Sequence, residues 1–258
     1  MMELFKVFQN HDEYFELLSQ GKYSKNFLLK QIGIILLFAF IYGVVMGSYN
    51  SFLQSIVTGV KVPVLITLAL LICFPALYVI QYILGSKMGL VQMIIMILSG
   101  FLMFSSILVS FAPIVLFFMI TGNDYNFLKL LHVAIFTFSG IFGMRIILEA
   151  LKFSCEKKNI YPKIGLNIFK FWIFVFAFVG MQLAWNLRPF LGDKNEEFEL
   201  FREREGNFYK AVVFSAANMF SYDKNAKNSR KHKNIEFKKN AAIDENDLIN
   251  NTDSVSYE

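Results

Sequence analysis

Cysteine, histidine and proline are scarce in this chain, which has two Cys, three His and five Pro in 258 residues. Two cysteines, Cys73 and Cys155, cannot build the disulfide framework of a small secreted domain. The histidines, His11, His132 and His232, stand far apart in the sequence and lack the spacing of metal ligands. The sequence therefore predicts neither a disulfide-stabilised fold nor a metal centre.

Sequence motifs of the common enzyme classes are also missing. The chain has no Gly-Lys-Ser/Thr phosphate loop, no His-Glu-x-x-His pair, no Gly-x-Ser-x-Gly elbow and no Gly-x-Gly-x-x-Gly fingerprint. We therefore expect a protein that is not an enzyme and needs no cofactor. An intramembrane enzyme would have to assemble its site from residues distant in the sequence.

Charged residues are absent from long stretches of apolar sequence. Apolar side chains make up 55% of the chain and aromatic ones 17%, with 30 phenylalanines. Windows of about 20 residues without charge match the thickness of a bilayer, whereas a soluble core spreads its apolar residues periodically. Because the runs lack the alternation of barrel strands, we predict an all-α integral membrane protein.

Five apolar runs are long enough to cross a bilayer. The third is longer than one crossing needs, and we interpret it as one long helix, bent near Ser99-Gly100 or Pro113, rather than two short ones. Pro63 suits the first turn of the second helix. The predicted spans are 31–49, 63–84, 90–120, 127–151 and 166–187.

Polar sequence flanks this membrane domain on both sides. We expect a cytoplasmic amphipathic segment at 1–30, a five-span domain at 31–187, a post-span interfacial segment at 188–220 and a disordered polar tail at 221–258. The helical spacing of the apolar residues in the first segment predicts an amino-terminal amphipathic helix. The positions that follow this helical spacing are Leu4, Phe8, His11, Phe15 and Leu18.

Positive charge is distributed unevenly among the connections between the spans. Lys61 is the only Lys or Arg in the sequence between the first two predicted spans. The connection between the third and fourth spans carries the acidic residue Asp124. By the positive-inside rule we predict an amino terminus in the cytoplasm and a carboxyl terminus outside it. The lysines on the predicted cytoplasmic side are Lys22, Lys25, Lys30, Lys87, Lys152, Lys157, Lys158 and Lys163.

The carboxy-terminal tail changes its charge midway. Residues 223–240 hold seven Lys or Arg and two acids, whereas residues 241–258 hold five acids and no Lys or Arg. The basic half could touch anionic lipid or nucleic acid, but Phe237 is its only aromatic residue. We expect a solvated tail and no nucleic-acid partner.

The stretch "AWNLRPFLG" ends the fifth run. Trp185 fits the aromatic belt of a membrane, Arg188 can reach lipid headgroups, and Pro189 prevents the helix from continuing. These properties are typical of a helix leaving a bilayer, and a specific binding role for Trp185, Arg188, Pro189 and Phe190 is the alternative.

The sequence that follows strengthens the second interpretation. "WNLRPFLGDKNEEFELFREREGNFYKAV" resembles an uncharacterised family of bacterial multi-pass membrane proteins in which Trp-x-Leu-Arg-Pro-Phe-x-Gly precedes an Arg-Glu-x-Asn-Phe sequence. "FPALYVIQYILG", residues 74–85, is similar to the second span of that family. The five-span layout is more distantly similar to the Yip family of membrane proteins. The resemblance implies a protein of the bacterial cytoplasmic (inner) membrane and implies no catalysis. It covers about residues 30–215 and matches Trp185, Leu187, Arg188, Pro189, Phe190, Gly192, Arg204, Glu205, Asn207 and Phe208.

Few polar residues interrupt the spans, and those that do are candidate functional groups. His132 lies within about two turns of the outer end of the fourth span, where it could reach water. Arg145 and Glu149 are four positions apart near the inner end and can pair. Close helix packing is predicted along Ala39, Gly43 and Gly47, either within one chain or between copies.

Two functions agree with this sequence. The first is a non-enzymatic organiser or assembly protein of the membrane, with membrane lipid and either a protein partner or a second copy of the chain as its partners. The alternative is a transporter or small-solute channel that uses the polar residues of the fourth span, favoured if His132 or Glu149 faces polar residues of another span.

Overall fold

The computed structural model of the protein describes residues 14–16, 25–122, 125–157 and 159–192. Within these ranges the chain is helical without strands, which confirms the all-α prediction. The expected amphipathic positions Leu4, Phe8, His11 and Leu18, the site residues from Arg204 to Phe208, and the polar tail lie outside the described residues.

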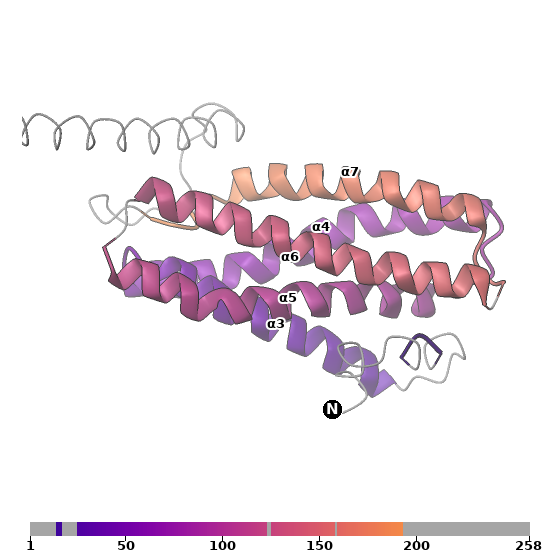
Figure 1. Cartoon of the computed structure of the whole chain (residues 1–258), viewed down its shortest axis with the longest axis horizontal. Coiled ribbons are helices and arrows are strands. Elements are labelled where there is room, and N and C mark those ends of the chain that lie inside the picture. Colours follow the sequence, from indigo (N-terminus) through magenta and orange to yellow (C-terminus); the bar gives the residue numbers. More distant parts are fainter. Residues whose placement is uncertain (1–13, 17–24, 123–124, 158, 193–258) are drawn as a thin grey trace, which may run out of the picture. The chain divides into compact units, whose positions relative to one another are not determined.

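Five helices of the described chain are long and apolar enough to cross a membrane, as predicted for a multi-pass protein (Figure 1). Neighbours along the chain run in opposite directions and are joined by short connections. The helices are α3 Lys25–Gly47, α4 Phe52–Ile83, α5 Leu90–Ile120, α6 Tyr125–Glu156 and α7 Lys163–Leu187.

The helices contact one another in a ring. Helix α3 packs between α4 and α5, α5 packs on α6, and α7 closes the ring by contacting both α6 and α4. The third apolar run forms the single helix α5, which passes through Ser99, Gly100 and Pro113 without a break and carries many buried side chains. The interpretation of this run as one long helix is therefore confirmed.

The predicted start of the second span at Pro63 is wrong. Helix α4 begins at Phe52, where the side chain of Ser51 caps it by accepting the N–H of Gln54 at 3.2 Å. Pro63 consequently lies inside the helix, and Lys61 is part of the span instead of a connection. Hydropathy misplaced this boundary because Gln54, Lys61 and their polar neighbours have the composition of a loop. In the folded protein, other parts of the chain form hydrogen bonds with these polar side chains.

The remaining boundaries differ less. Helix α3 starts before predicted residue 31, while α6 and α7 extend beyond 127–151 and 166–187. The polar residues of these extra turns fall outside an apolar window but still continue a helix. Cys155, expected on a connection, is buried near the end of α6, and Cys73 is buried within α4.

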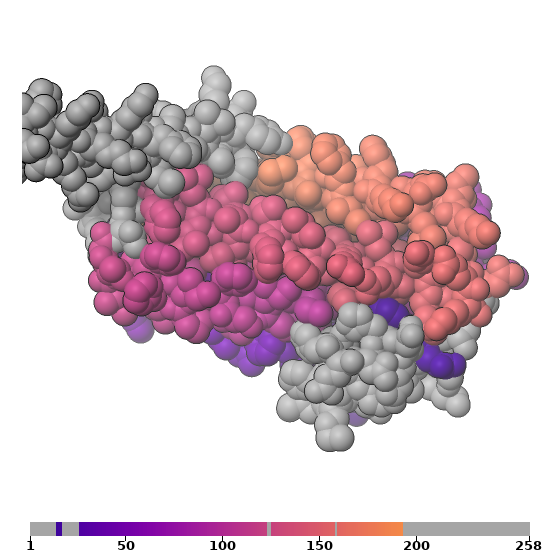
Figure 2. All heavy atoms as spheres, in the orientation of Figure 1, coloured from indigo at the N-terminus to yellow at the C-terminus, as the bar shows by residue number. Residues whose placement is uncertain are grey.

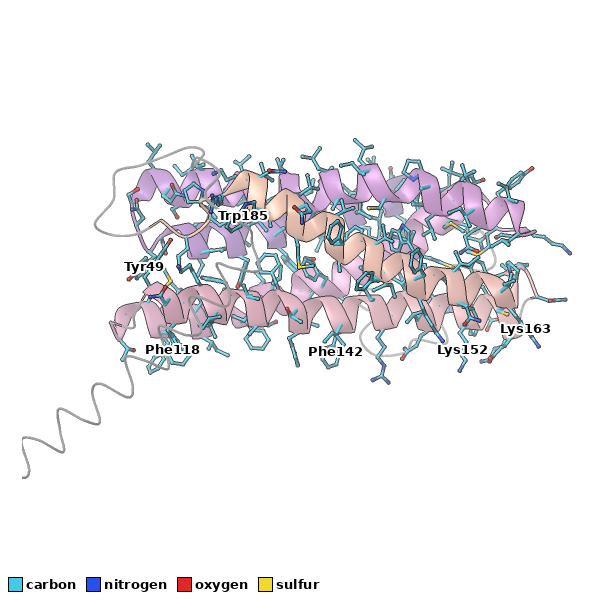
Figure 3. The ribbon with its side chains drawn as sticks, turned by 90° about the horizontal axis from the view of Figure 1, so that it is seen from above. Tyr49, Phe118, Phe142, Lys152, Lys163 and Trp185 are labelled. Atoms are coloured by element: carbon cyan, nitrogen blue, oxygen red, sulfur yellow. The ribbon has the colours of Figure 1, made fainter. Side chains whose placement is uncertain are left out.

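The bundle has two chemically different ends. We call one the basic end, which holds the start of α3 and the α4–α5 and α6–α7 connections, with exposed Lys30, Lys87 and Lys163. We call the other the exit end, because α7 terminates there beside the α3–α4 and α5–α6 connections. Figure 3 shows Lys152 and Lys163 at the basic end, and Tyr49, Phe118 and Trp185 toward the exit end.

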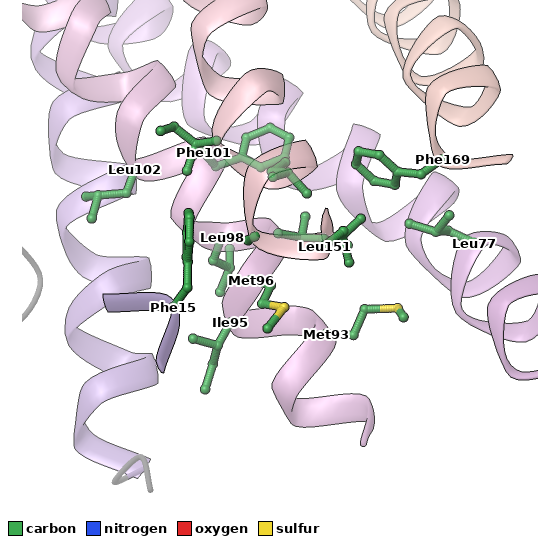
Figure 4. Close-up of a cluster of buried hydrophobic side chains, with 14 of the residues drawn as sticks. Phe15, Leu77, Met93, Ile95, Met96, Leu98, Phe101, Leu102, Leu151 and Phe169 are labelled. Carbon is green, nitrogen blue, oxygen red and sulfur yellow. The ribbon is translucent and has the colours of Figure 1, made fainter. Parts of the chain in front are cut away.

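Part of the amino-terminal segment packs into the core near the basic end. Phe15 is buried, lies beside residues of α5 in Figure 4, and contacts the ring of Phe153 with 6.0 Å between ring centroids. Tyr14 is buried beside it, and its hydroxyl lies 2.8 Å from Oγ of Ser99 in α5. Burial raises the pKa of Tyr14 to about 12, and the hydrogen bond with Ser99 opposes that shift.

Apolar side chains cover much of the lateral surface. Figure 2 shows that α6 and α7 form much of one lateral face. Ile141 of α6 and Phe171 and Phe174 of α7 are exposed. Exposing such an apolar surface to water would be unfavourable, whereas lipid chains solvate it. The fold therefore presents to the bilayer the apolar residues that do not fit in the core.

Candidate functional site

The segment after α7 returns to the bundle and packs against its exit end. Helix α7 stops at Leu187, and Arg188 adopts an extended conformation that leads into Pro189. Pro189, Leu191 and Gly192 are buried. The segment is therefore part of the folded bundle, in contrast to a chain that simply leaves the membrane.

Three polar side chains of α4 hold this segment. Gln54, Thr58 and Lys61 lie at positions i, i+4 and i+7, which places them on one face of the helix. Gln54 Nε2 and Lys61 Nζ both donate to the carbonyl of Pro189 at 3.1 Å. Thr58 Oγ1 donates to the carbonyl of Phe190 at 2.8 Å. We call these three side chains and two carbonyls the exit clamp.

The clamp gives a physical reason for a lysine inside a membrane helix. The side chain of Lys61 is only 6% exposed. A buried ammonium group costs free energy unless it is hydrogen-bonded or paired, and carbonyl acceptors meet part of this need. Hydrogen bonds from charged donors are stronger than those between neutral groups. Lys61 therefore contributes to holding the exit segment.

Glycines of α3 allow the clamp helix to approach closely. A Cβ added to Gly43 would lie 2.6 Å from the carbonyl oxygen of Thr58, and one added to Gly47 would lie 2.5 Å from that of Gln54. Ser55 donates to the carbonyl of Val44 at 2.7 Å across the same contact. For Gly43 and Gly47 the predicted small-residue packing is thus a contact within one chain, between α3 and α4.

Aromatic residues complete the exit end. Tyr125 donates its hydroxyl to the carbonyl of Leu191 at 2.9 Å, and its ring stacks on Tyr49 with 6.3 Å between centroids. The guanidinium carbon of Arg188 lies 3.8 Å from the ring centroid of Trp185. This cation–π contact directs Arg188 along the side of α7.

The structure brings together the four predicted residues Trp185, Arg188, Pro189 and Phe190 but assigns them different contacts. Pro189 and Phe190 contribute backbone carbonyls to the clamp, while Arg188 and Trp185 contact each other. Gln54, Thr58 and Lys61 were not among the site residues predicted from the sequence. Their helical spacing was the available signal, but it was hidden because that stretch was assigned to a connection.

His132 lies in the interior of the bundle, contrary to the expectation that it could reach water at the helix end. It is 2% exposed, and its Nδ1 lies 2.8 Å from the hydroxyl of Tyr42 in α3. The face of α6 that carries His132 turns toward α3 and α5, which removes the ring from bulk water. Tyr42 is the polar residue of another span that it faces.

Arg145 and Glu149 occupy a different face of α6. Arg145 Nε lies 2.8 Å from Glu149 Oε1, which confirms the predicted pairing, and the two side chains are 70% and 35% exposed. Exposed pairs of this spacing contribute little to stability. Their position on the outer surface separates Glu149 from the Tyr42–His132 pair.

Other buried polar groups also connect helices. Gln81 Nε2 of α4 donates to the carbonyl of Gly165 in α7 at 3.0 Å, and Trp172 Nε1 donates to the carbonyl of Cys73 at 3.1 Å. Within the described ranges, no group of three or more His, Cys, Asp or Glu side chains is placed to hold a metal ion. Much of the polar chemistry inside this bundle joins one helix to the next.

Comparison with protein-family models, with curated proteins and with solved structures finds no match. The resemblance of the Trp-x-Leu-Arg-Pro-Phe-x-Gly sequence to a bacterial membrane family therefore stays a prediction.

Proposed function

We propose that this protein is a non-enzymatic organiser of the bacterial cytoplasmic membrane. The helical bundle anchors the chain in the bilayer, and the exit clamp fixes the point from which residues 193–258 leave the bundle. Those residues engage a protein partner, with lipid as an additional contact. The basic end faces the cytoplasm, so this engagement takes place on the outer side of the membrane.

The exit clamp is the observation that carries the proposal. Three side chains of α4 are committed to two backbone carbonyls of a segment more than 120 positions away in the sequence. A helix end that needs only to stop could leave these carbonyls to water and headgroups. Fixing the exit point instead reduces the conformational freedom of the sequence that follows, which favours its presentation to a partner.

The distribution of charge supports the proposed orientation. Exposed lysines at the basic end lie on the α4–α5 and α6–α7 connections and at the start of α3. Short connections rich in lysine remain on the cytoplasmic side. The same rule puts the exit end and Arg188 outside.

Site-specific photo-crosslinking tests the organiser proposal. A photoreactive amino acid is placed at Arg204 or Phe208 in the full-length protein, and crosslinks are formed in intact cells. We expect a discrete crosslinked protein band that weakens when Thr58→Val loosens the clamp and persists with Thr67→Val. Thr67 is a matched control because its hydroxyl donates to the Pro63 carbonyl of its own helix, at 2.9 Å.

Three results would contradict the proposal. Crosslinks to lipid alone would replace a protein organiser with a membrane-binding segment. An absence of discrete products, or products that Thr58→Val leaves unchanged, would remove the role of the clamp in presenting the segment. A band composed of two differently tagged copies of this chain would instead agree with the proposal and identify the partner as a second copy of the protein.

A transporter is a second candidate function, favoured by the Tyr42–His132 contact between α3 and α6. Polar groups that meet between spans are a common feature of transport pathways. Reconstituted protein and its His132→Gln variant would be compared for proton and solute flux in liposomes. Flux that depends on His132 would favour this candidate, whereas equal, background flux would exclude a transport role for the pair.

A further inference from the structure

The Tyr42–His132 pair is closely fixed inside the exit-end half of the bundle. The phenol and imidazole rings meet edge to face, with 5.7 Å between centroids and an interplanar angle of 84°. Phe136, one turn from His132, also contacts the Tyr42 ring, with 5.6 Å between centroids. The hydrogen bond to Nδ1 therefore forms in a setting that restricts both rings.

Counting donors and acceptors assigns the proton of His132. If the Tyr42 hydroxyl donates to Nδ1, the neutral ring carries its proton on Nε2 and one donor remains to be satisfied. If Nδ1 donates to Tyr42 instead, both the phenol proton and the Nε2 lone pair remain. The first arrangement leaves fewer buried groups unsatisfied, and it is therefore the more stable one.

The remaining donor has no acceptor from the described part of the protein. Nε2 is buried, and no described atom forms a hydrogen bond with it. The hydrophobic cluster in this part of the bundle consists of apolar residues such as Leu108, Val115 and Leu128, whose side chains cannot accept one. Leaving an N–H group buried in this way is unfavourable, and buried water molecules commonly satisfy such groups.

The depth of His132 makes water the appropriate acceptor. His132 is seven residues from the first residue of α6, Tyr125, or about 10 Å along the helix axis. A helix of 32 residues exceeds a hydrocarbon core of about 30 Å by about 18 Å. Placed symmetrically, α6 extends about 9 Å beyond the core at each end, so His132 lies near the hydrocarbon boundary. Side chains on a helix also lean toward its amino terminus, which here is the exit end.

We propose that His132 is a buried water-binding site, in which Nε2–H donates to a water molecule that enters from the exit end. Tyr42 is the positioning residue, because its hydroxyl bond to Nδ1 selects the protonated Nε2 form. The site does not depend on the proposed organiser function, since it involves none of the exit-clamp residues and no residue beyond 192.

Solid-state nitrogen-15 NMR of the full-length protein in lipid bilayers tests this site. His11→Gln and His232→Gln leave His132 as the only histidine. We expect a single neutral tautomer with a protonated Nε2 and a hydrogen-bonded Nδ1, together with magnetisation transfer from water to the Nε2 proton. Tyr42→Phe should keep the water transfer but give a mixture of tautomers, because nothing then selects Nδ1 as the acceptor.

Three results would overturn the inference. A ring protonated on Nδ1 would show that the direction of the Tyr42 bond is reversed. A protonated Nε2 without transfer from water would exclude the bound water. An unchanged tautomer in Tyr42→Phe, with the protein still folded as judged by its remaining spectrum, would show that Tyr42 does not position the ring.

Discussion

Thr58 donates its hydroxyl to the carbonyl of Phe190 across 2.8 Å, joining two residues that lie 132 positions apart in the sequence. The contact connects the early part of the second span to the segment that follows the fifth. It belongs to the exit clamp, together with the bonds from Gln54 and Lys61 to Pro189.

Thr58→Val should loosen the exit segment. The substitution keeps the shape of the side chain but removes the hydrogen bond to the Phe190 carbonyl, which is part-buried, at a cost of about 0.5–1.5 kcal/mol. We expect faster maleimide labelling of a cysteine placed at Leu191, in a background where Cys73 and Cys155 are serine. The same reporter should label no faster with Thr67→Val, and equal rates in both variants would contradict the role of Thr58.

Gly43→Ala should weaken the packing of α3 on α4. An added methyl group would meet the backbone of Thr58 at 2.6 Å, so the helices must separate, at a cost of about 1–3 kcal/mol. Thermal unfolding in detergent, followed by size-exclusion chromatography, would measure the loss. Gly33→Ala is the matched control, because a Cβ at Gly33 meets nothing within 4 Å. A Gly43→Ala protein as stable as the control would show that the helices can move apart freely.

Docking of the amino-terminal turn should weaken at high pH. Burial raises the pKa of Tyr14 from 10.0 to about 12, so an exposed Tyr14 loses its proton at a lower pH than the docked one. The stabilisation is fully present below pH 10 and is lost as pH rises from 10 to about 12. Hydrogen exchange of residues 14–16, measured at rising pH with correction for the intrinsic exchange rate, would follow this loss. Tyr14→Phe cannot ionise at this position and should lack the extra dependence.

The two ends of the bundle should be accessible from opposite sides of the membrane. Single cysteines at Gly122 and Asn159 report on the exit end and the basic end, after Cys73 and Cys155 have been replaced by serine. We expect an impermeant maleimide to label Gly122→Cys in intact cells and Asn159→Cys only after lysis. The reverse pattern would place the basic end and the amino terminus outside the cytoplasm.

Much of the architecture could be predicted because hydropathy is a local property. A run of about 20 apolar residues must be helical in lipid, whatever its neighbours do, since its backbone has to satisfy its own hydrogen bonds. The pairing of Arg145 with Glu149 was predictable for the same reason, because both lie on one helix four positions apart. The start of α4 could not be predicted, because Lys61 becomes compatible with the span through tertiary contacts, among them its hydrogen bond to the Pro189 carbonyl.

Hydropathy along the chain is enough to identify a helical membrane protein with five apolar segments, the last of which ends in a Trp-Asn-Leu-Arg-Pro-Phe sequence. Which polar groups meet depends on the tertiary structure. Gln54, Thr58 and Lys61 find their acceptors beyond α7, and His132 finds Tyr42 in α3. The order of residues along one chain does not specify such partners, because they depend on how the helices close into a ring.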